Sequence, residues 1–137
     1  TKDYFMASNT PVSGEQFLAA NAARPEVTTT ASGLQYEVLE SGSGARPGPR
    51  SMVVTHYHGT LVDGTVFDSS VARGQPAMFG VHQVIPAWTE ALQLMTVGSK
   101  WRIACPSNLA YGERGAGGVI GPNATLVFEI HLLDIKV

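Results

Sequence analysis

Beyond residue 32 the chain has only one segment with clear helical periodicity, and this limits its possible folds more than any other feature. Trp88, Ala91, Leu92 and Met95 lie at positions i, i+3, i+4 and i+7, so they share one face of a helix. Pro86 precedes this segment and Gly98 follows it, as is common at helix ends. We therefore expect a single short helix over residues 88–95, and the rest of the core must come from strands.

The remaining apolar residues mostly follow a two-residue period, which is typical of strands. Strands are expected over residues 34–39, 52–62, 65–67, 77–81, 100–105 and 124–137, with loops over 41–50, 69–76 and 106–122. Asp63-Gly64 is a strong hairpin signal. Short strands joined by turns and loops, with one helix among them, predict an α+β fold in which an antiparallel sheet packs on that helix.

The first 32 residues differ from the rest. Residues 1–12 are expected to be a loose tail, and Ser13 and Gln16 have the spacing of a helix capping box. The helix should run to Arg24, because the residue before Pro25 is disfavoured in the α conformation. A β-branched linker is expected over 28–32. The predicted organisation is therefore an N-terminal tail, short helix and linker over 1–32, and one domain over 33–137.

Composition excludes several classes of function. Charged residues make up 15% of the 137 residues and the formal net charge is -2, so we expect no nucleic-acid partner. Cys105 is the only cysteine, which excludes a disulfide framework or a multi-cysteine metal site. No run approaches about 18 apolar residues, so no membrane span is expected. The chain begins at Thr1 without a signal-type apolar run, and any targeting segment is expected to lie outside it.

Familiar catalytic and cofactor motifs are missing from the sequence. His56 and His58 should point to the same face of one strand, but no cysteine or third histidine has ligand spacing, so neither a metal site nor a cofactor is expected. Cys105 lies in an apolar strand and is expected to be a buried, inert thiol. What remains is a set of apolar residues in predicted loops and at strand ends, including Tyr111 and Ile120. Apolar residues that converge from loops are typical of a preformed apolar pocket.

An ordered series of motifs resembles the FKBP-type peptidyl-prolyl cis–trans isomerases over residues 33–137. The series comprises Tyr57, DGTVFDSS at 63–70, QVIP at 83–86 with Trp88, LAYG at 109–112 and IGPNATLVF at 120–128. The N-terminal helix and SGLQY at 32–36 resemble the Mip (macrophage infectivity potentiator) branch. The resemblance implies a half-barrel in which an antiparallel sheet of five or six strands wraps around the short helix.

The resemblance also implies residue roles. By this resemblance, Tyr57, Asp68 and Tyr111 are expected to be catalytic, and Arg73 is expected to support Asp68. Trp88 should form the pocket floor, and the backbone N–H of Ile85 should donate to a substrate carbonyl. The remaining substrate-binding residues are expected to be Phe67, Val84, Val119, Ile120 and Phe128. Ala77, Ala87 and Ala116 depart from the usual pattern, and Ala77 and Ala116 are expected to widen the pocket rim.

The function implied by the resemblance is rotation about Xaa–Pro bonds through non-covalent stabilisation of the twisted amide. The expected partners are proline-containing peptides, unfolded proteins and macrolide inhibitors of the immunosuppressant type. Two alternatives stay open: a non-catalytic module that binds proline segments, and a folding chaperone or virulence factor that acts through partner binding. The Mip resemblance implies a secreted or exported protein, and the short N-terminal helix favours a monomer.

Overall fold

A seven-stranded antiparallel sheet forms the body of the protein. The computed structural model describes residues 13–116 and 120–136. Neighbouring strands follow the order β1-β2-β6-β7-β3-β4, and β5 also pairs with β3. The strands are β1 (Val27–Thr29), β2 (Gln35–Glu40), β3 (Met52–Leu61), β4 (Val66–Ser69), β5 (Ala77–Gly80), β6 (Lys100–Cys105) and β7 (Leu126–Lys136). The predicted antiparallel α+β class is confirmed, with more strands than the five or six expected.

The two long central strands, β3 and β7, pair along nearly their whole length and have one buried face. In β3 the residues at 53, 55, 57 and 59 are buried, whereas those between them are half-buried. In β7 the residues at 126, 128, 130 and 132 are buried in the same alternating way. This pattern is the two-residue period of the sequence, and it directs Tyr57 and Phe128 to the same side of the sheet.

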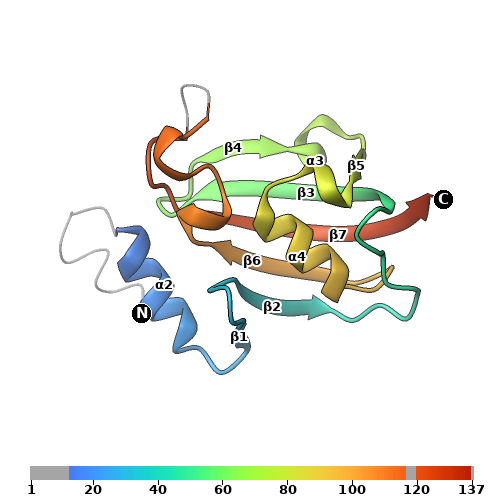
Figure 1. Ribbon diagram of the computed structural model, residues 1–137, viewed down its shortest axis with the longest axis horizontal. Coiled ribbons are helices and arrows are strands. Elements are labelled where there is room, and N and C mark those ends of the chain that lie inside the picture. The colour runs from blue at the N-terminus through green and yellow to red at the C-terminus, as the bar shows by residue number, and fades with distance from the viewer. Residues whose placement is uncertain (1–12, 117–119, 137) are drawn as a thin grey trace.

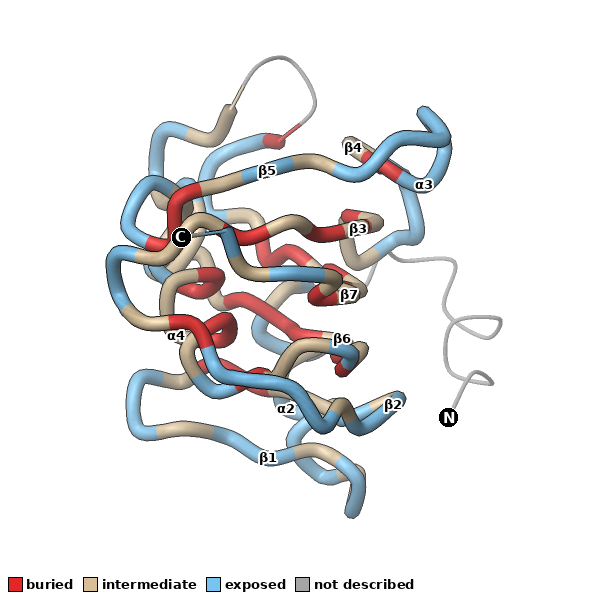
Figure 2. The backbone as a smooth tube through the Cα atoms, turned by 90° about the vertical axis from the view of Figure 1, so that its right-hand side faces the viewer, coloured by how far each residue is buried: buried red, intermediate tan, exposed pale blue. Residues whose placement is uncertain are grey.

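The helix α4 (Pro86–Leu94) packs against that buried face (Figure 1). Trp88, Ala91 and Leu92 are buried, as the predicted helical face required. Together with the inner sides of β3, β6 and β7 they form one core (Figure 2). The helix begins at Pro86 and ends at Leu94, so it lies about two residues earlier than expected at its start, with Met95 as its C-terminal cap.

Several short elements occur where loops or a linker were expected. β1 lies in part of the expected linker and pairs with β2. The one-turn helix α3 (Ser70–Arg73) lies in the expected 69–76 loop, and two 3-10 turns, η2 (Ser107–Leu109) and η3 (Gly112–Arg114), lie in the expected 106–122 loop. Another 3-10 turn, η1 (Val81–Gln83), follows β5. These elements are too short to produce a periodic signal.

The N-terminal helix α2 (Gly14–Ala22) begins with the predicted capping box. The Ser13 hydroxyl accepts a hydrogen bond from the Gln16 N–H at 3.1 Å, and the Gln16 side chain accepts one from the Ser13 N–H at 3.0 Å. No residue of α2 is buried, and the helix ends before Arg24. Polar contacts hold it to β2: the Asn21 amide donates to Gln35 at 2.8 Å, and the Arg24 guanidinium pairs with Glu37 at 2.9 Å.

The hairpin between β3 and β4 turns at the predicted Asp63-Gly64 pair. Gly64 has a φ of +92°, a conformation that residues with a side chain rarely adopt, and Asp63 accepts a hydrogen bond from the Thr65 N–H at 2.9 Å. This turn brings β4 alongside β3 and places Asp68 opposite Gly59, next to Tyr57. Over the described ranges, no helix has the length and apolarity needed to cross a membrane.

Candidate active site

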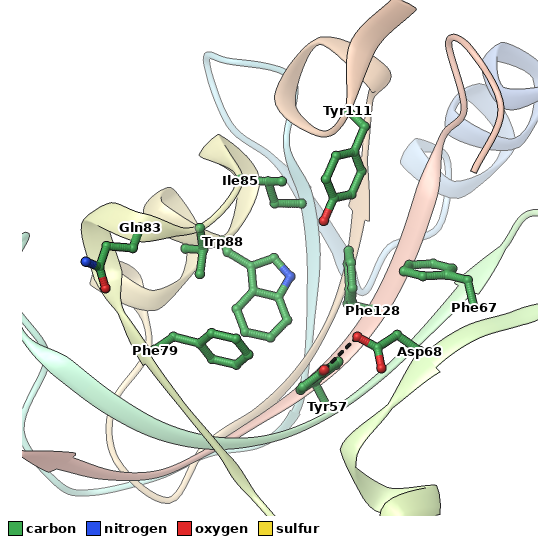
Figure 3. A pocket seen from close by; sticks show the side chains of 10 residues that line it. Tyr57, Phe67, Asp68, Phe79, Gln83, Ile85, Trp88, Tyr111 and Phe128 are labelled. Atoms are coloured by element: carbon green, nitrogen blue, oxygen red, sulfur yellow. Dashed lines mark hydrogen bonds between the residues drawn. The ribbon is translucent and has the colours of Figure 1, made fainter. Parts of the chain in front are cut away.

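An apolar cavity of about 420 Å³ opens between the start of α4 and the inner face of the sheet (Figure 3). The side chains that line it come from β3, β4, β5, β7, α4 and two loops. They are Tyr57, Phe67, Asp68, Phe79, Gln83, Val84, Ile85, Trp88, Tyr111 and Phe128. The set is mostly aromatic or aliphatic with few polar groups, which is the usual composition of a small-ligand site.

Trp88 is a buried residue in the lining of this cavity. It lies in the first turn of α4 and is 4% exposed. Its ring makes edge-to-face contacts with Tyr57, Phe79 and Phe128, each with a centroid distance of 5.3 Å. Phe67 in turn meets Phe128 edge to face at 5.4 Å. Edge-to-face packing of this kind holds each ring against its neighbours, so the floor and walls are preformed.

A polar triad lies at one side of the cavity. The Tyr57 hydroxyl donates to one carboxylate oxygen of Asp68 at 2.6 Å, and the Arg73 guanidinium donates to the other at 2.6 Å. Arg73 also donates to the Tyr57 hydroxyl oxygen at 3.0 Å, and its guanidinium carbon lies 5.7 Å from the centre of the Tyr57 ring. The three side chains therefore form a closed hydrogen-bonded ring.

The triad keeps both titratable groups in defined states at neutral pH. Partial burial raises the pKa of Asp68, but hydrogen bonds from Tyr57 and Arg73 and the charge of Arg73 lower it more, so its net pKa lies below 3.8. Burial, followed by the hydrogen bond to Asp68, raises the pKa of the Tyr57 phenol above 10. Asp68 is thus an anion and Tyr57 a neutral donor in the pH range where most proteins work.

Two further hydrogen-bond donors belong to residues that line the cavity. The Tyr111 side chain is 41% exposed, and its hydroxyl points into the cavity between Ile85 and Phe128 (Figure 3). Ile85 caps the N-terminus of α4 with an extended backbone. Its carbonyl accepts from Trp88 and Thr89, whereas its N–H has no backbone acceptor among the described residues.

Most of the predicted site residues converge on this cavity. Tyr57, Phe67, Asp68, Val84, Ile85, Trp88, Tyr111 and Phe128 line it, and Arg73 contacts two of them. Ile120 does not line it: the residue is 7% exposed, belongs to the core and forms an isolated bridge with Ala116. The prediction for Val119 lies outside the described residues.

The sequence reasoning missed two lining residues, Phe79 and Gln83. Phe79 lies two positions after Ala77 on β5, so both side chains face the same side of the sheet. Ala77 was expected to leave the rim wide, but Phe79 supplies an aromatic wall nearby. Gln83 directly precedes the Val84-Ile85 motif, and that adjacency was the available signal for its position.

The histidines lie away from this cavity. His56 and His58 point to the opposite side of β3 from Tyr57, as predicted, and the strand register places His131 opposite His56. In the part of the chain that the structure describes, no three His, Cys, Asp or Glu side chains are grouped to hold a metal ion. Cys105 is fully buried, and this burial raises the pKa of its thiol.

Comparison with known proteins shows which family this chain belongs to. A family model described as FKBP-type peptidyl-prolyl cis-trans isomerase matches residues 44–133, and one described as the domain amino terminal to that isomerase matches 4–38. The chain is 52% identical to the outer membrane protein MIP of Legionella longbeachae, covering 95% of this chain and 56% of that protein. It is 57% identical to an FKBP-type 22 kDa peptidyl-prolyl cis-trans isomerase of Escherichia coli, covering 89% and 59%.

Solved structures agree with this result. The crystal structure of FkpA from Escherichia coli superimposes with a TM-score of 0.86 at 43% identity, covering 90% of this chain and 57% of that one. The chain thus spans a little over half the length of the two curated relatives described above.

Proposed function

The chain belongs to the FKBP-type peptidyl-prolyl cis–trans isomerases, and on that premise we propose that it accelerates rotation about Xaa–Pro bonds in the cavity above Trp88. The observation that carries this proposal is the joint arrangement of a rigid aromatic cavity and a hydrogen-bonded Tyr57–Asp68–Arg73 triad at its side. An apolar cavity of this size suits a proline ring and the residue before it.

The reaction itself requires little chemistry. Rotation about an amide bond meets a barrier of about 18–20 kcal/mol, which arises from the resonance of the planar amide. Both isomers of an Xaa–Pro bond are populated, so both are substrates. No bond is broken, and no nucleophile is needed. An acceleration of about 10⁴-fold requires only about 5.5 kcal/mol of additional transition-state stabilisation.

The arrangement of the cavity suggests how that stabilisation arises. The proline ring packs on the Trp88 indole between the Phe67, Phe79 and Phe128 rings, whose mutual contacts hold them in place. The planar ground state is the more dipolar form of the amide, so apolar surroundings favour the twisted form by comparison. Only interactions that are stronger in the transition state accelerate the step.

Donors at the cavity orient the substrate chain. In this proposal, the Tyr111 hydroxyl and the Ile85 N–H donate to substrate carbonyls on either side of the proline. In the same proposal, the Asp68 carboxylate lies beside the twisting bond, and its negative charge acts on the carbonyl as the amide dipole changes. Because the triad is already hydrogen bonded, it needs little reorganisation during the reaction.

Three further assignments extend this proposal. We infer that the cavity also accepts macrolide inhibitors, because a ligand that presents a proline-like ring would use the same aromatic floor. We infer an isomerase domain over 33–137 preceded by a separate N-terminal region over 1–32. We also infer that the protein is exported, since a relative covering most of the chain is named an outer membrane protein.

A protease-coupled assay on a peptide with a cis Xaa–Pro bond tests the proposed activity. We expect rapid turnover. A macrolide inhibitor should reduce this turnover in proportion to the fraction of protein to which it is bound. The matched control is His82→Ala, an exposed residue of η1 outside the cavity lining, which should retain wild-type turnover. Tight binding of the peptide without turnover would support the proline-segment binding module instead.

A further inference from the structure

The Asp68–Arg73 ion pair belongs to a short segment that would not be stable in isolation. Asp68 lies in β4, and Arg73 ends α3, a helix of only four residues. The side chains of Asp68 and Arg73 are 42% and 52% exposed. An isolated helical turn is unstable, and an exposed ion pair contributes little to its own ordering. The geometry of the triad must therefore be imposed by other contacts.

Two buried serines between Asp68 and the rest of α3 provide those contacts. Ser69 and Ser70 are 5% and 0% exposed. The Ser69 hydroxyl caps α3 by accepting from the Ala72 N–H at 3.1 Å. The Ser70 hydroxyl accepts from the Tyr57 N–H at 2.7 Å, so it ties α3 directly to the strand residue that hydrogen bonds to Asp68.

Each serine also contacts a histidine on the outer side of β3. The His58 Nδ1 lies 2.9 Å from the Ser69 hydroxyl, and the His56 Nδ1 lies 2.9 Å from the Ser70 hydroxyl. Because Ser69 accepts from Ala72, its only proton is free for His58. The Ser70 proton can reach His56 at 2.9 Å or the Tyr57 carbonyl at 3.3 Å, and the shorter contact favours His56.

We propose that His56 and His58 are positioning residues of the isomerase site, acting from the outer face of the sheet through Ser70 and Ser69 to hold Asp68 and Arg73 in place. This inference rests on the proposed function, because it assigns the triad a catalytic task. It accounts for two half-buried histidines whose ring nitrogens both point at the one short segment that carries the triad.

Among the described residues, no hydrogen bond joins the other groups on this outer face to Ser69 or Ser70. His131, Lys100 and Glu129 surround the two histidines in a shallow hollow together with Val71. Strand register places His131 opposite His56 and Glu129 opposite His58. The Glu129 carboxylate pairs with Arg102 at 3.1 Å. His131 therefore shares the surroundings of His56 without its bond to the β4–α3 segment, which makes it a matched control.

The test compares variants that keep or remove a polar group at the Nδ1 position. An Asn side chain places its amide near the position of Nδ1, whereas Leu removes the bond at similar volume. We expect the double variant His56→Leu with His58→Leu to lose about tenfold in kcat/KM, because displacement of catalytic groups is costly. The double Asn variant should recover most of this loss, and His131→Leu should match the wild type.

A second readout is independent of turnover. The pKa of Asp68, followed by carbon NMR of its carboxyl group, should rise toward the ordinary value of about 3.9 in the double Leu variant and stay depressed with Asn or with His131→Leu. An inactive wild type with these pKa changes would reject the proposed function but keep the positioning role. A folded double Leu variant with wild-type pKa would overturn the positioning role.

A second pair of variants covers the case in which the double Leu variant does not fold. His58→Gln places its amide near the Nε2 position, beyond reach of Ser69, whereas His58→Asn keeps it near Nδ1. Both are polar and similarly suited to a half-buried strand position. We expect the pKa of Asp68 to be higher in the Gln variant than in the Asn variant. Equal values in the two variants would overturn the proposal.

Discussion

Asp68 is the residue on which the proposed mechanism depends most. Its carboxylate accepts from Tyr57 and Arg73, yet it remains 42% exposed, so its contribution to folding stability is small. We expect Asp68→Ala to lower kcat/KM by at least about tenfold, since removing one preorganised electrostatic group commonly costs more than that. The thermal midpoint should change little. Turnover equal to the wild type in a folded variant would remove Asp68 from the mechanism.

Tyr111 provides a test at the opposite side of the cavity. Its hydroxyl points into the cavity, and the side chain is 41% exposed (Figure 3). Tyr111→Phe removes one donor and keeps the ring, so we expect kcat/KM to fall several-fold, about the effect of one lost hydrogen bond to substrate, with unchanged stability. Tyr36→Phe, whose ring stacks on Trp101 outside the cavity, is the control and should behave as the wild type.

The depressed pKa of Asp68 predicts how stability depends on pH. A carboxyl group whose pKa is lower in the folded than in the unfolded state stabilises the fold above its unfolded pKa, and this contribution is lost as pH falls through the folded pKa. The pKa of an ordinary aspartate is about 3.9, and the pKa of Asp68 in the folded protein is lower. The difference in unfolding free energy between wild type and Asp68→Asn should thus be constant above pH of about 5 and shrink below about 4. A difference that grows on acidification would contradict the assigned ion pair.

At the scale of residues, the sequence predicted which side chains of the family motifs would line the cavity. Tyr57, Asp68, Trp88 and Tyr111 were assigned through their resemblance to a known pattern, and all four line the cavity. Phe79 was not predicted because the aromatic of the family pattern is expected at position 77, which is alanine here, whereas Phe79 lies two residues further along β5. Ile120 was expected among the cavity residues, but it is 7% exposed and belongs to the buried core cluster.

At the scale of elements, long periodic segments were predictable and short ones were not. The alternation in β3 and the helical face of α4 follow from spacing alone. β1 has three residues, too few for a period, and it is a strand only because Val27 to Thr29 pair with β2. α3 likewise depends on its Ser69 cap and on the αL conformation of Gly74, which closes the turn.

The loop after β6 depends on one glycine. Gly115 has a φ of +66°, and a Cβ there would clash with the Ile120 carbonyl oxygen. We expect Gly115→Ala to disrupt the Ala116–Ile120 bridge and lower kcat/KM, because Tyr111 lies on the same loop. Gly121→Ala, which would meet nothing within 4 Å, is the matched control. If both variants had equal turnover and equal stability, this loop would not position Tyr111.

At the scale of the whole molecule, the N-terminal helix packs on the outside of the domain, and we expect the domain to fold without it. α2 contributes no buried residue, and polar contacts from Asn21 and Arg24 join it to β2. We expect a chain of residues 26–137 to keep its turnover and to lose about 1–3 kcal/mol of unfolding free energy, because buried Gln35 loses its partners Asn21 and Leu18. Loss of turnover in a folded truncated chain would show that α2 supports the cavity.

The same view of α2 leads us to expect a monomer. A helix of nine residues offers little surface for a stable interface. Sedimentation of residues 1–137 should therefore give the mass of one chain across a range of concentrations. A dimer that persists on dilution would overturn this expectation.

The central claim is that the cavity accelerates rotation without changing the equilibrium between isomers. Exchange NMR on an Xaa–Pro peptide, with a small amount of protein added, measures both rates directly and needs no protease. We predict that the cis-to-trans and trans-to-cis rates rise by the same factor while the isomer ratio stays fixed, and that Asp68→Ala removes most of the increase. Peptide resonances that shift on binding while the exchange rates stay at their uncatalysed values would contradict the account.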